Sequence, residues 1–115
     1  MSARIKKHAE TLRLLAKSKG PLVKTIVCAA DRHLVDTLCE CAKNVLKGNV
    51  HITTKQKEKL KKHKKRLREL VKKNGTLTKK KKILQTGGFL LALLAPIAGA
   101  VLGPLLGRLF GNGTR

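Results

Sequence analysis

Aromatic and acidic residues are scarce in this sequence. It has no tryptophan or tyrosine, and its two phenylalanines, Phe89 and Phe110, lie near the C-terminal end. Because the bases of single strands and RNA loops stack on aromatic rings, a binding site of that kind is excluded. Only 6 Asp and Glu oppose 27 Lys and Arg, and the formal net charge is +21. A balance this basic indicates a polyanionic partner.

Patterns of catalytic and metal-binding residues are also missing. Cys28, Cys39 and Cys41 are an odd number of cysteines among apolar neighbours, which favours reduced, buried thiols in an intracellular setting over a disulfide framework. Two residues apart on a helix, Cys39 and Cys41 point about 200° away from each other, unlike the paired thiols of zinc sites. The four histidines have no ligand spacing, and no nucleophile and base pair is recognisable. The sequence therefore predicts neither an enzyme nor a bound metal or cofactor.

Positive charge is concentrated in one segment. Residues 1–54 carry 10 basic and 4 acidic side chains, a balance of +6, whereas residues 55–82 carry 15 basic and 2 acidic ones, a balance of +13. Lysine dominates here, and its ammonium group favours contacts with phosphate over bidentate recognition of guanine. An anionic membrane surface and plain solubility are the alternatives. The predicted DNA-binding residues of this basic segment are Lys55, Lys57, Lys59, Lys61, Lys62, Lys64, Lys65, Arg66, Arg68, Lys72, Lys73, Lys79, Lys80, Lys81 and Lys82.

Apolar and capping patterns predict an all-α chain. Asp31 and Gly48 are the predicted N-cap and C-terminal residue of the most core-like helix. Thr53 and Gln56 fit a capping box that opens a long basic helix reaching about Lys73. No strand pattern and no internal repeat is found, so the expected fold is a small helical bundle.

The chain divides into four segments. Residues 1–52 form the predicted core of the helical bundle, and residues 53–82 form the basic helix and its Lys-rich continuation. A Gly-Gly junction at 83–88 leads into an apolar tail, residues 89–115, which contains Gly and Pro. The expected order is thus a small helical bundle, a long basic helix, and a C-terminal apolar helix or hairpin.

The region around the apolar tail carries no charge from residue 83 to residue 107, a length that suffices to cross a bilayer. Three interpretations are open: a membrane-spanning or membrane-disrupting helix, a segment packed on a protein partner, or a hairpin that covers the chain's own core. An apolar surface of this size needs a cover of some kind. Glycines that recur every four residues form a ridge for membrane insertion or helix packing: Gly99, Gly103, Gly107 and Gly111.

The junction resembles a known viral pattern. A Lys-rich segment, the run Gln85-Thr86-Gly87-Gly88 and an apolar stretch that begins at Phe89 follow one another. This order is similar to that in precursors of the adenoviral core protein mu (protein X), and to basic proteins of adenovirus-like elements such as adintoviruses and Polintons. The resemblance covers residues 79–107 and implies cleavage between Gly88 and Phe89 by a viral cysteine protease. Upstream the two differ, because the mu precursor is Arg-rich and largely unstructured.

Together these patterns predict a DNA-binding and DNA-condensing core or accessory protein of a virion that does not recognise a specific sequence. Its expected locations are the virion and the host nucleus. Its expected partners are double-stranded DNA or another polyanion, a capsid protein or membrane through the tail, the viral protease, and further copies of itself. The alternative is a tail-anchored or membrane-permeabilising cationic protein that acts at anionic intracellular membranes.

Overall fold

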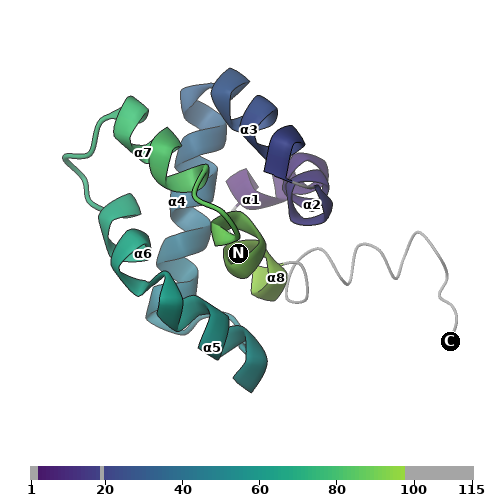
Figure 1. Cartoon of the computed structure of the whole chain (residues 1–115), viewed down its shortest axis with the longest axis vertical. Coiled ribbons are helices and arrows are strands. Elements are labelled where there is room, and N and C mark those ends of the chain that lie inside the picture. The colour runs from purple at the N-terminus through teal and green to yellow at the C-terminus, as the bar shows by residue number, and fades with distance from the viewer. Residues whose placement is uncertain (1–2, 19, 98–115) are drawn as a thin grey trace, which may run out of the picture.

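Helices account for the regular structure of the residues that the computed structural model describes, 3–18 and 20–97 (Figure 1). No strand occurs among them, so the predicted all-α class is confirmed. In chain order the eight helices are α1 (Ala3–Lys7), α2 (Ala9–Lys17), α3 (Gly20–Ala29), α4 (Arg32–Lys47), α5 (Thr54–Lys62), α6 (Lys64–Leu70), α7 (Leu77–Leu84) and α8 (Phe89–Ile97).

The predicted helix caps of α4 and α5 are confirmed. The Asp31 carboxylate accepts a hydrogen bond from the Leu34 N–H at 2.9 Å. Gly48 ends α4 with a φ of 77°, a left-handed conformation that glycine adopts without steric cost. At the start of α5, the Thr53 hydroxyl accepts the Gln56 N–H and the Gln56 side chain accepts the Thr53 N–H, which completes the capping box.

The long basic helix expected from Thr53 to about Lys73 is interrupted and shorter, so that prediction is wrong. It breaks at His63. The His63 N–H donates to the Leu60 carbonyl, three residues before it, at 3.0 Å, whereas an α-helical N–H donates to the carbonyl four residues before it. The second part, α6, ends at Leu70. The Lys79–Lys82 run lies in a further helix, α7, whose N-cap Thr76 accepts the Lys79 N–H at 3.2 Å.

Helix α4 is central and is buried on most of its circumference. This placement buries both Cys39 and Cys41, although they point to different sides of the helix. The buried Thr37 hydroxyl donates to the His33 carbonyl at 2.7 Å, which satisfies it inside the core. The same burial was expected of Cys28, and there the prediction is wrong. Cys28 is exposed because only Val27 of α3 is fully covered.

Helix α8 lies in the middle of the bundle, between the N-terminal helices and the basic ones (Figure 1). It packs against α2, α4 and α5. Its buried residues are Phe89, Leu90, Ala92, Leu93, Leu94, Pro96 and Ile97. Of the three interpretations of the tail, coverage of the chain's own core is therefore confirmed for residues 89–97, and the core extends across the predicted segment boundaries.

Two further predictions about the tail are the glycine ridge and the crossing of a bilayer. Gly99, Gly103, Gly107 and Gly111 lie outside the described residues. Within residues 3–18 and 20–97, none of the helices has the length and apolar character that crossing a bilayer requires.

The α8 packing predicts unequal effects for two leucines of this helix. Leu93 is fully buried, whereas Leu91 is 53% exposed. We expect Leu93→Ala to lower the free energy of unfolding by about 2–5 kcal/mol, because it leaves a cavity in the core. The matched change Leu91→Ala should lower it by less than about 1 kcal/mol. Urea unfolding followed by circular dichroism measures both, and equal effects would contradict the burial of α8.

Candidate nucleic-acid interface

Lysine and arginine side chains cover the outer faces of α5, α6 and α7. The two helices α5 and α6 bury one narrow stripe, Leu60, Leu67 and Leu70, which leaves their charges outside. The three helices follow one another along one edge of the molecule (Figure 1). Thirteen of the fifteen predicted cations are exposed there: Lys55, Lys57, Lys59, Lys61, Lys62, Lys64, Lys65, Arg66, Arg68, Lys72, Lys73, Lys79 and Lys82. We call these thirteen residues the basic face.

The other two predicted cations, Lys80 and Lys81, are half-buried and hold α7 in place. The Lys81 ammonium donates to the Cys28 carbonyl at 3.0 Å, near the end of α3. The Lys80 stem passes Gly75 so closely that a Cβ at Gly75 would lie 3.2 Å from the Lys80 Cε. Its charged end reaches the surroundings of Cys39 on α4. These two residues therefore act within the fold rather than on its outer face.

A hollow of about 140 Å³ brings cations from distant parts of the chain together. Arg4 of α1 and Lys43 of α4 line it with Lys72, Lys73 and Lys80. Sequence reasoning did not include Arg4 and Lys43, because nothing in the linear pattern joins them to the basic segment. Two carboxylates, Asp36 and Glu40, and the thiol of Cys39 line the same hollow.

The thiol of Cys39 lies at this hollow but is protected. Burial raises the pKa of Cys39, and the nearby Lys80 ammonium opposes part of that rise. Burial also raises the pKa of Cys41, to about 12. Since the thiolate is the reactive form, both thiols stay protonated and unreactive near neutral pH.

The Gly-Gly junction is a tight turn, and the residue that follows it, Phe89, lies in the core. Gly87 and Gly88 are exposed, and Gly88 has a φ of 76°, which favours glycine. The Phe89 N–H donates to the Thr86 carbonyl at 3.0 Å, and the Phe89 side chain is only 1% exposed. Gln85 ends α7 and donates from Nε2 to the Cys28 sulfur at 3.4 Å. On the Gly88 side the peptide bond between Gly88 and Phe89 thus lies at the surface, whereas Phe89 on its other side is buried at the start of α8.

The break between α5 and α6 meets α8 through an aromatic contact. The rings of His63 and Phe89 lie edge to face, with centroids 5.6 Å apart and an interplanar angle of 86°. The His63 Nδ1 is buried and has no hydrogen-bond partner. Burial lowers the pKa of His63, and the positive charges of Arg66 and Lys62 lower it further. Burial and these two charges therefore favour the neutral imidazole of His63.

No group of three or more His, Cys, Asp or Glu side chains that could hold a metal ion occurs in the part of the chain that the structure describes. Comparison with protein-family models, curated proteins and solved structures found no match to this chain.

The His63 environment predicts a loss of stability in mild acid. Because the folded-state pKa is below the unfolded value of about 6.5, the unfolded chain binds more protons at lower pH. Stability should therefore be full above about pH 6.5 and fall as the pH drops towards the folded-state pKa. We expect the urea midpoint to decrease between about pH 7.5 and about pH 5.5, and His63→Leu to remove most of this decrease.

An exposed histidine provides the matched control for this experiment. His51→Gln should retain the decrease of the parent chain, because His51 is exposed. An unchanged decrease in His63→Leu would show that other groups cause the acid sensitivity.

Proposed function

We propose that this chain binds and condenses double-stranded DNA without sequence preference, as a core or accessory protein of a virion. The observation that carries the proposal is the basic face, with thirteen exposed cations along one edge of a folded bundle. Neutralisation of phosphates by such cations releases counterions and supplies most of the free energy of non-specific binding.

The dimensions of α5 and α6 support a duplex as the ligand. At about 1.5 Å per residue, α5 and α6 together supply at most about 25 Å of length, because they are separate helices that meet at His63. A duplex presents about 15 phosphates over that length, counting both strands. Phe89 is buried, so the described residues offer no exposed Phe, Tyr or Trp ring for stacking on unpaired bases. Contacts with the backbone of a duplex suit this surface better than contacts with bases.

Repulsion within the basic face also favours a polyanion. Lys55 and Lys59, Lys57 and Lys61, and Lys64 and Arg68 are like-charged pairs four residues apart, each within one helix. Each pair costs a few tenths of a kcal/mol on a helix, about 0.2–0.5 kcal/mol. Phosphates bound along this face remove that cost, so DNA binding should stabilise α5 and α6.

The virion location and the processing step are parts of the same proposal. They rest on the resemblance of residues 79–107 to adenoviral mu precursors, with cleavage after Gly88 by a viral cysteine protease. The exposed Gly87 and Gly88 support access to this bond from its N-terminal side, and cleavage requires local opening around the buried Phe89. Phe89 and the buried face of α8 place the other product in the core, where it would stay bound after cleavage.

The proposal predicts a steep and specific salt dependence. We expect a log–log slope of roughly −7 for DNA affinity against salt if about eight phosphates are neutralised. Five substitutions to Gln, at Lys61, Lys62, Lys64, Lys65 and Arg66, should reduce the magnitude of this slope by about 4. Fluorescence anisotropy with a short labelled duplex over a salt series measures it.

A variant with the same loss of charge elsewhere serves as the control. Its five substitutions to Gln, all at exposed positions on α1 to α4, are at Lys7, Lys17, Lys24, Arg32 and Lys47. It should change the slope much less. Equal slopes in the two variants would show that net charge, and not the basic face, determines binding. Tighter binding to anionic vesicles than to DNA would favour the membrane alternative.

Cleavage at the junction predicts a two-fragment particle. After hydrolysis of the Gly88–Phe89 bond, the fragment that starts at Phe89 should remain with residues 1–88, because α8 fills the core. Native mass spectrometry should find one particle containing both fragments, and denaturing conditions should separate them. Spontaneous release of the fragment, with cooperative unfolding retained by residues 1–88, would contradict this expectation.

A further inference from the structure

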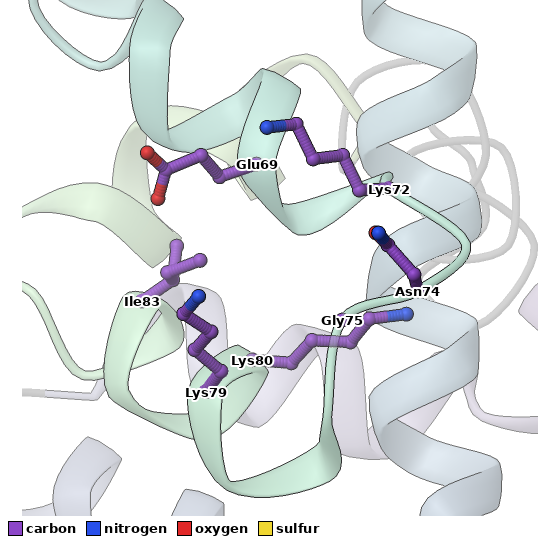
Figure 2. Close-up of a pocket in the computed structure, with 7 residues that line it drawn as sticks. All are labelled: Glu69, Lys72, Asn74, Gly75, Lys79, Lys80 and Ile83. Carbon is purple, nitrogen blue, oxygen red and sulfur yellow. The ribbon is translucent and has the colours of Figure 1, made fainter.

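A hollow of about 300 Å³ lies between the end of α6 and the start of α7. We call it the α6–α7 hollow. Lys72 borders it on the α6 side, Lys79 and Lys80 border it on the α7 side, and Asn74 lies in the connecting loop (Figure 2). Glu69 is the one carboxylate among its lining residues. Unlike the lysines that spread along α5, these side chains converge on a single space.

The loop that forms this hollow is held in place from two directions. Thr76 caps α7 through the Lys79 N–H, which fixes the first turn of that helix. Gly75 lies against the stem of Lys80, and a Cβ at Gly75 would lie 3.2 Å from the Lys80 Cε, so a side chain there would shift that stem by a few tenths of an ångström. Because Lys80 reaches towards α4, the loop is anchored to the central helix. The hollow therefore exists before a ligand binds.

The chemistry of the hollow suits a single anion. Lys72 and Lys79 are exposed ammonium groups that provide three N–H donors each, and the Asn74 amide adds two more. The start of α7 contributes partial positive charge from its aligned peptide dipoles. Glu69 reduces the positive charge of the lining, which lessens the advantage that a doubly charged terminal phosphate would have over a singly charged phosphodiester.

We propose that the α6–α7 hollow is a seat for one phosphodiester group of the bound duplex. This inference rests on the proposed DNA-binding function and adds a fixed point to it. Cations on α5 and α6 neutralise the backbone over a length, whereas the seat holds one phosphate in a defined position. A protein with such a seat would bind the duplex in a preferred orientation although it reads no sequence.

The test compares two pairs of exposed lysines that carry the same charge. Lys72→Gln with Lys79→Gln removes the seat, and Lys57→Gln with Lys61→Gln removes two cations of α5. We expect the first double variant to bind a short duplex about tenfold more weakly than the second, because charge-assisted hydrogen bonds are lost together with the charges. Circular dichroism melting checks that both variants are folded.

A small probe separates the seat from general attraction of DNA. Dimethyl phosphate, a phosphodiester with one charge, is titrated at constant ionic strength while backbone amide signals are followed by NMR. Saturable shifts confined to residues 74–80, lost in the Lys72 and Lys79 double variant and kept in the α5 variant, are the expected result. Shifts that do not saturate, or that are equally strong along α5, would overturn the seat.

The DNA measurements also distinguish failure of the seat from failure of the proposed function. If both double variants weaken DNA binding equally, the seat is wrong and non-specific binding by the basic face stands. If neither variant changes DNA affinity or its salt dependence, both proposals are overturned. In Glu69→Gln, tighter binding of dimethyl phosphate would support the seat, and unchanged binding would count against it.

Discussion

Packing of α8 against α2, α4 and α5 is the interaction on which the rest of the molecule depends. Helices α5 and α6 carry many like charges and offer the core only a narrow apolar stripe, so they cannot fold as an independent unit. The uncharged, almost fully buried α8 gives α5 a partner and joins it to the N-terminal helices, whereas α6 packs against α4 and α7. Without α8, the apolar area that remains would be small for a chain of this net charge.

Local signals in the sequence predicted local structure well, and tertiary contacts decided the rest. Asp31, Gly48 and Thr53 act through atoms within a few residues, so their roles follow from sequence alone. The break at His63 does not, because it accompanies a contact with Phe89, 26 residues away. An apolar helix such as α8 has the same composition whether it enters a bilayer or a protein core, and the surrounding helices determine which occurs. The convergence of Arg4 and Lys43 with the basic segment is likewise a property of the fold.

Some lysines of the basic segment hold the fold together and others stay exposed, and their spacing in the sequence does not show which. Lys80 and Lys81 belong to a run of four, yet the fold directs one towards α4 and the other onto the end of α3. Their neighbours Lys79 and Lys82 remain exposed. The first pair fixes α7 to the bundle, and this fixed helix then supplies a defined position for Lys79. Lys80 and Lys81 thus hold α7 in place, and the charge of Lys79 is presented from this fixed helix.

If the chain binds phosphates as proposed, the contact between His63 and Phe89 of α8 couples that binding to the stability of the core. Lys62 and Arg66 belong to the basic face, and their charges lower the pKa of His63, whose ring packs on Phe89. Phosphates that bind near these cations reduce the local positive potential, so the pKa of His63 moves back towards its ordinary value. The same phosphates would relieve the repulsion along α5 that opposes its packing on α8. By linkage, an anion that binds more tightly to the folded chain stabilises that packing, and disruption of α8 weakens anion binding by the same free energy. Binding of phosphates to the basic face and packing of the core would therefore stabilise each other.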